Sequence, residues 1–88
     1  MYFIILAKFK KQPTKALAAE AMNLIADDVK EGVKVHGFYF TLGQYDAVGI
    51  FEARDEKAAM KMAMRRGDFA NTETLVALPL EEVKKIVE

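Results

Sequence analysis

The sequence predicts a single α+β domain, in which two helices lie on one face of a four-stranded antiparallel sheet. Three observations support this fold class. Strand-forming residues fill positions 2–9, two more strand-like runs flank Gly43-Gln44, and two segments with a helical apolar period separate these runs from their neighbours. A chain of 88 residues is long enough for one domain, so residues 1–88 are expected to form a single unit.

The first half of the chain begins with a strand and a helix. Tyr2–Phe9 is apolar at nearly every position, which is typical of a strand buried on both faces. Thr14 follows Pro13 and suits a helix N-cap, so a helix is expected from about Thr14 to Glu31. Gly32 is a natural helix end. The expected apolar side of this helix comprises Leu17, Ala18, Ala21, Met22, Leu24, Ile25 and Val29.

A hairpin is predicted from two strands, at 33–42 and 45–53, joined by Gly43-Gln44. Glycine at the first central position fits a two-residue type II′ turn, and such a turn fixes the pairing of the strands. The predicted pairs are Leu42 with Tyr45, Phe40 with Ala47, Phe38 with Gly49 and His36 with Phe51. The other sheet face would then carry Val33, Val35, Gly37, Tyr39, Thr41, Asp46, Val48, Ile50 and Glu52.

The second half is expected to add a helix, a strand and a short terminal helix. Asp55 suits the N-cap of the helix and Gly67 its end. Arg65 and Arg66, in the last turn, are interpreted as charges that suit the negative end of the helix dipole. A strand is predicted at 72–78. The terminal helix follows Pro79 and has an apolar side of Leu80, Val83, Ile86 and Val87.

This β-α-β-β-α-β order, with an added C-terminal helix, is the order of a ferredoxin-like sandwich. Right-handed crossovers place both main helices on one sheet face and the first strand at the centre. The other face would be apolar and open to water, which monomers rarely tolerate. A symmetric partner laid sheet to sheet would cover it, so we expect a homodimer or a multiple of one. The alternative is that the terminal helix folds back over the open face.

Composition argues against several classes of function. The chain has 13 basic and 13 acidic residues, a net charge of zero, which disfavours a nucleic-acid binder and a polybasic membrane anchor. No apolar run approaches the length of a membrane span, and a cytoplasmic location is expected. With no cysteine and a single histidine, a thiolate or histidine-rich metal site is excluded. We expect no cofactor.

The segment GFYFTLGQYDAV, at residues 37–48, contains Gly43, Tyr45 and Asp46 with Gln44 between them. It resembles the GYD domain family, which is named for this Gly-x-Tyr-Asp turn. The segments 52–59 and 71–75 also resemble the family's pattern, so the resemblance extends from Gly37 to Leu78. It implies a fold similar to that of dimeric α+β barrel proteins and no established biochemical role.

Few side chains are candidates for chemistry. His36 is the only histidine and the candidate general base, although no nucleophile stands at a triad spacing from it and a packed or edge histidine is the alternative. The candidate ligand-binding residues, which would border a pocket between paired sheets, are Tyr39, Thr41, Tyr45, Asp46 and Asn71. In the predicted register Tyr45 lies on the opposite face from Tyr39. The structural alternative is that these groups serve hydrogen bonds within the chain, with Asp46 bracing the hairpin through backbone N–H groups.

These observations favour a homo-oligomeric module that binds a small ligand between its sheets. The alternative is a small cofactor-independent enzyme resembling those of dimeric α+β barrels, with His36, Tyr39 and Asp46 as its working residues. That alternative rests on fold analogy. An RNA-binding sheet that uses Phe38, Tyr39 and Phe40 is disfavoured, because stacking surfaces of this kind need a basic, exposed face.

Overall fold

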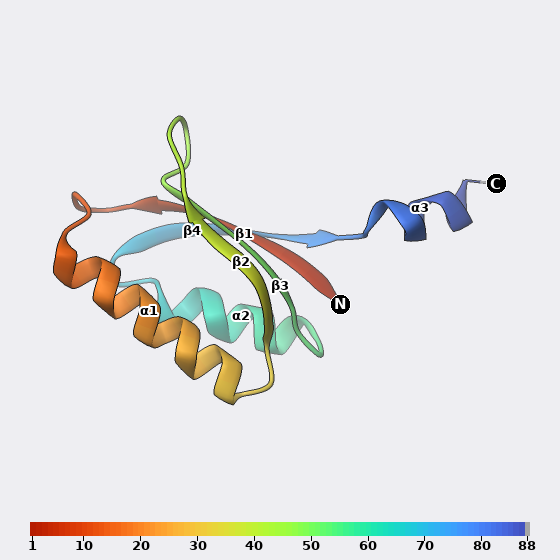
Figure 1. The fold of residues 1–88 in the computed structure, drawn as a ribbon, viewed down its shortest axis with the longest axis horizontal. Coiled ribbons are helices and arrows are strands. Elements are labelled where there is room, and N and C mark those ends of the chain that lie inside the picture. Colours follow the sequence, from red (N-terminus) through yellow and green to blue (C-terminus); the bar gives the residue numbers. More distant parts are fainter. Residues whose placement is uncertain (88) are drawn as a thin grey trace.

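The computed structural model describes residues 1–87. Its elements are β1 (Tyr2–Phe9), α1 (Lys15–Lys30), β2 (Lys34–Phe40), β3 (Ala47–Glu52), α2 (Glu56–Arg65), β4 (Ala70–Ala77) and α3 (Leu80–Ile86). The four strands form an antiparallel sheet in the order β2-β3-β1-β4, so the apolar β1 is central. Figure 1 shows α1 and α2 together on one side of this sheet, which confirms the predicted ferredoxin-like arrangement. None of the helices within residues 1–87 is both long and apolar enough to cross a membrane.

The two main helices begin at the predicted caps. The Thr14 hydroxyl accepts a hydrogen bond from the Leu17 amide, and the Asp55 carboxylate accepts one from the Ala58 amide. Each cap satisfies an N–H group that the first turn of a helix leaves without a partner. Gly32, with a φ of 95°, follows α1 in the left-handed region that favours glycine.

The hydrophobic core lies between the helices and one face of the sheet. Phe3 and Ile5 of β1, Phe51 of β3 and Met62 of α2 are at most 2% exposed. The rings of Phe3 and Phe51 stack with their centroids 5.6 Å apart. Because side chains alternate along a strand, the residues between these positions face away from the helices.

A β-bulge at His36 changes which side chains of β2 face the core. The observed pairs are Val35 with Phe51, Phe38 with Gly49 and Phe40 with Ala47. Two predicted pairs are therefore confirmed, and the predicted pairing of His36 with Phe51 is wrong. The extra residue reverses the alternation of side chains before it. As a result Val33 and Val35 pack with the core on the side of Phe38, and not on the predicted face of Tyr39, while His36 faces away from the helices.

The predicted two-residue turn is also wrong, because a longer loop joins β2 to β3. The Thr41 amide donates to the Asp46 carbonyl at 2.9 Å, and the Thr41 hydroxyl donates to the Tyr45 carbonyl at 2.6 Å. These two bonds close the loop one residue beyond each strand, and Leu42 is fully exposed instead of pairing with Tyr45. Gly43 adopts a φ of 110° at the tip, where glycine is favoured. The last strand also begins earlier than predicted, at Ala70 instead of Thr72.

A buried ion pair joins the two main helices. Asp28 of α1 is fully buried, and its carboxylate accepts hydrogen bonds from Arg65 at 3.0 Å and Arg66 at 2.6 Å. Arg66 is itself 6% exposed and also donates to the Met62 carbonyl. Arg65 and Arg66 thus hold the end of α2 to α1, a role that their interpretation as charges suited to the helix dipole did not include.

We predict that Asp28→Asn lowers the free energy of unfolding by about 3 kcal/mol, because it leaves the buried Arg66 guanidinium without a counter-charge. Urea denaturation followed by circular dichroism measures this loss. Asp27→Asn is the matched control, since Asp27 is exposed and its replacement should change stability by less than about 0.5 kcal/mol. Equal losses in the two variants would contradict a special role for Asp28.

Candidate functional site

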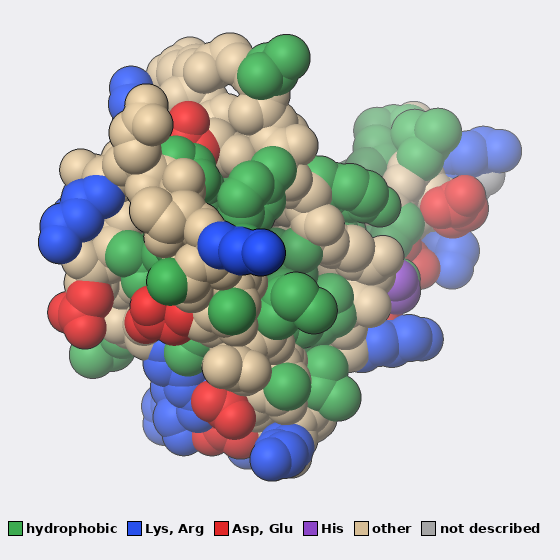
Figure 2. All heavy atoms as spheres, turned by 60° about the vertical axis from the view of Figure 1, so that its left-hand side comes forward, with side chains coloured by type: hydrophobic (Ala, Val, Ile, Leu, Met, Phe, Trp, Pro, Cys, Tyr) green, Lys and Arg blue, Asp and Glu red, His purple; other side chains and the backbone are tan. Residues whose placement is uncertain are grey.

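The open sheet face is the side of the sheet that points away from α1 and α2. Its centre is apolar and comprises Ile4, Leu6, Tyr39, Val48, Ile50 and Leu75. Figure 1 shows α3 leaving the end of β4 and pointing away from the sheet, so α3 does not fold back over this face, contrary to the alternative considered from the sequence. In Figure 2, α3 stands off the body with hydrophobic side chains on its surface.

At one end of the open face, His36, Tyr2 and Glu52 form a cluster. The His36 and Tyr2 rings stack with centroids 5.3 Å apart, and His36 Nε2 lies 3.3 Å from Glu52 Oε2. Hydrogen bonding from the Tyr2 hydroxyl lowers the pKa of Glu52, and His36 and Lys34 act in the same direction. The Glu52 carboxylate in turn raises the pKa of Tyr2.

This cluster is partly open to water. The side chains of His36 and Glu52 are each about one-third exposed. An imidazole with one nitrogen next to a carboxylate has its ring oriented, which is the arrangement of a positioned base. The bulge at position 36 creates this arrangement, since the predicted register would have placed His36 on the aromatic face instead.

At the other end of the open face, Tyr45 donates a hydrogen bond to Glu73 at 3.0 Å, and this carboxylate raises the pKa of Tyr45. Glu73 pairs with Leu6 on the open side, so Tyr45 lies on the same side as Tyr39, which corrects the predicted placement. Asp46 accepts a hydrogen bond from the Phe9 amide at 2.7 Å, where the ladder between β1 and β3 ends. The expected bracing role of Asp46 is present, although its partner is on β1 and not in the hairpin.

The structure brings four of the five predicted ligand-binding residues to this end. Thr41, Tyr45 and Asp46 share the loop, and Asn71 stands opposite Lys8, two positions from the Glu73 that binds Tyr45. Tyr39 lies on the outer strand β2, and its ring passes over Gly37. His36, the candidate base, is at the opposite end of the face. The predicted residues therefore do not form one site within a single chain.

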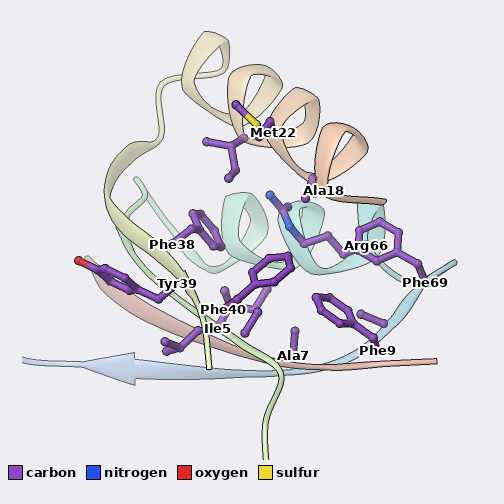
Figure 3. Close-up of a pocket in the computed structure, with 16 residues that line it drawn as sticks. Ile5, Ala7, Phe9, Ala18, Met22, Phe38, Tyr39, Phe40, Arg66 and Phe69 are labelled. Carbon is purple, nitrogen blue, oxygen red and sulfur yellow. The ribbon is translucent and has the colours of Figure 1, made fainter. Parts of the chain in front are cut away.

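A second feature, which sequence reasoning missed, is a cleft between α1 and the other side of the sheet. Its volume is about 200 Å³. Three aromatic rings line it in a row, with Phe9 5.4 Å from Phe40 and 6.4 Å from Phe69 between centroids. Figure 3 shows Arg66 extending across this cleft beneath α1, while the Tyr39 ring points away from it.

One signal for this region was available in the sequence. Asp28 comes four residues after Leu24 and three after Ile25, so it falls on the apolar side of the predicted helix. A carboxylate at such a position needs a buried cationic partner. Among residues 1–87, no group of three or more acidic, histidine or cysteine side chains is placed to hold a metal ion.

We predict that Tyr2→Phe raises the pKa of Glu52 toward its ordinary value of 4.5, because it removes the largest cause of the lowering. A carboxyl whose pKa is lowered by folding contributes stability above its unfolded pKa and loses it as the pH falls through the folded pKa. The acid loss of stability should therefore begin at a higher pH in the variant. Carbon-detected NMR titration of glutamate carboxyls measures the pKa directly. Tyr45→Phe is the control and should leave Glu52 unchanged; an unchanged pKa in Tyr2→Phe would contradict the assignment.

Solved structures share the fold of this chain. The structure of B. subtilis LrpC superposes with a TM-score of 0.66 at 14% identity, over 89% of this chain and 50% of that chain. The crystal structure of MtbAldR superposes with a TM-score of 0.51 at 13% identity, over 89% of this chain and 52% of that one. At such identities the likeness shows the fold alone. The chain spans about half the length of each of these proteins, and no curated protein matches it in sequence.

The sequence match to a family is more specific than these structural likenesses. The family model described as the GYD domain matches residues 3–87, which include the whole sheet except the first residue of β1. Gly43, Tyr45 and Asp46 lie within that match, at the loop that the Asp46 and Tyr45 hydrogen bonds hold against β1 and β4. The chain belongs to the GYD domain family, a family of uncharacterised function.

Proposed function

We propose that this protein is a self-associating module whose copies pair through their open sheet faces. The observation that supports it is the apolar centre of that face, which no described segment covers. Tyr39, Ile50 and Leu75 are 55%, 36% and 40% exposed in the single chain. Burial of such side chains against a partner would remove them from water, which is the main source of stability in protein association.

The area of the sheet face alone lies at the lower limit for a specific pair. Strands of up to eight residues in a four-stranded sheet make a face of roughly 25 by 20 Å, or about 500 Å² on each partner. Two such faces bury about 1,000 Å² in total, which is near the lower limit for specific interfaces. The exposed apolar side of α3 extends the available surface, since Leu80 and Ile86 are 73% and 68% exposed.

The distribution of polar groups also fits an interface. Charged and hydroxyl side chains gather at the two ends of the open face, around Glu52 and around Glu73, and leave the centre apolar. An apolar centre with a polar rim is the usual anatomy of a protein interface. In a two-fold pair each copy presents the same patch, so no second kind of surface is needed.

A small ligand between the paired sheets is the finer part of this proposal. Its residues would be those gathered at the Glu73 end, Thr41, Tyr45, Asp46 and Asn71, with Tyr39 contributed from the outer strand. The hydrogen bonds of Thr41, Tyr45 and Asp46 already serve partners within the chain. Asn71 is exposed and is the member of the set best placed to meet a ligand.

We predict that Ile50→Lys weakens self-association at least about 100-fold, because it places an unpaired charge at the centre of the buried face. Sedimentation equilibrium over a range of protein concentrations measures the dissociation constant. Met60→Lys is the matched control, since Met60 is 64% exposed on α2, on the far side of the sheet. It should leave association unchanged.

Leu75→Lys, on β4, provides a second test at the same face and should behave like Ile50→Lys. Circular dichroism establishes that each variant is folded. A monomeric wild-type protein at tens of micromolar would contradict the proposal, and so would association that Met60→Lys disrupts as strongly as Ile50→Lys.

A further inference from the structure

The cleft lies beneath Ala18 and Met22 of α1, away from the ion pair that joins the last turn of this helix to α2. Within α1, all of which the structure describes, Asp28 is the only buried residue, and it lies in the last turn. Near the other end, Ala18 and Met22 line the cleft without closing it (Figure 3). The ion pair to Arg65 and Arg66 therefore holds the end of α1 against α2, while the first turns leave apolar surface of the sheet uncovered.

The size and lining of the cleft restrict what it can hold. A cavity of about 150 Å³ with apolar walls accepts a benzene molecule, so about 200 Å³ suits one aromatic ring with a short substituent. Drug-sized ligands occupy larger pockets, of about 300 Å³ or more. The rings of Phe9, Phe40 and Phe69 meet at tilted angles, and such walls favour edge and offset contacts with another ring.

The positive charge of Arg66 favours an anionic substituent on an aromatic ligand bound in the cleft. It uses one N–H group toward Asp28 and one toward the Met62 carbonyl, of the five that a guanidinium carries. Its guanidinium lies 5.5 Å from the centroid of the Phe38 ring and lines the cleft. The ion-pair cluster as a whole has three cations, Lys61, Arg65 and Arg66, for two carboxylates, Asp28 and Glu31.

We propose that this cleft binds a small monocyclic aromatic carboxylate, with the ring among the phenylalanines and the carboxylate on Arg66. A carboxylate uses the guanidinium's remaining donors in charge-assisted hydrogen bonds and offsets the excess positive charge. The site lies on the helix side of the sheet, so it is separate from the open face proposed for pairing and does not depend on it.

The test uses two probes with the same ring and three-carbon chain: 3-phenylpropionate, which ends in a carboxylate, and 3-phenylpropan-1-ol, which ends in a neutral hydroxyl. The Arg66 side chain is left intact, because its replacement would also leave Asp28 unpaired. NMR titration of the full chain should show saturable shifts at Ala18, Met22 and Ile25, with a dissociation constant of about 1 mM or tighter for the acid. The alcohol should bind at least about tenfold more weakly, since its neutral hydroxyl cannot form an ion pair with Arg66 or accept the two parallel hydrogen bonds that a carboxylate accepts.

A pair of variants tests the location. Ala18→Phe places a ring inside the cleft and should weaken binding of 3-phenylpropionate at least about tenfold. Ala19→Phe, the next residue, is exposed outside the cleft and should leave binding unchanged. Circular dichroism verifies the fold of both. The proposal is overturned if the acid fails to saturate, if acid and alcohol bind equally, if the shifts fall on the open face, or if the two variants behave alike.

Discussion

Two helices can cover only one face of a four-stranded sheet, and the main features of this protein follow from that limit. The chain buries Phe3, Ile5 and Phe51 under α1 and α2, and it leaves the alternate residues of the same strands open to water. The central strand β1 is apolar on both sides, so the open face cannot be a solvated surface of the usual kind. Because α3 points away from the sheet, no segment of the chain within residues 1–87 covers this face (Figure 1). The proposed pairing would remove this apolar face from water.

On the helix side of the sheet, the packing of α1 combines modest apolar burial with a buried ion pair. Small residues such as Ala18 and Ala21 face the sheet from α1, and the one fully buried side chain of this helix is Asp28, which binds the two arginines. A buried ion pair is costly to break but stabilises little compared with well-packed apolar residues. The ion pair therefore fixes the contact between the last turn of α1 and α2, and it does not pack the rest of α1 against the sheet. The cleft is the space that remains, and its one charged lining residue belongs to the same ion pair.

Much of the fold could be predicted from the sequence, because the signals were local. Thr14 and Asp55 are caps whose partners lie three residues away, and the apolar run at 2–7 favours a central place for β1. The errors came from contacts between distant segments. The loop is held partly by Asp46 binding the Phe9 amide, 37 residues away. For the bulge at His36 the local sequence offers one weak signal, the neighbouring Gly37 within a strand. Contacts between distant segments also decide that His36 and Tyr39 lie apart from the loop residues and that Arg66 crosses a cleft, so neither could be predicted from the sequence.

The measurement that tests the pairing of open faces most directly is an isotope-filtered NOE experiment on a mixture of labelled and unlabelled protein. It detects contacts only between different chains. Pairing through the open faces should give intermolecular NOEs among the methyl groups of Ile4, Leu6, Ile50 and Leu75, which all lie on the open face. A sample without intermolecular NOEs, or with NOEs confined to the α1 and α2 side, would contradict it.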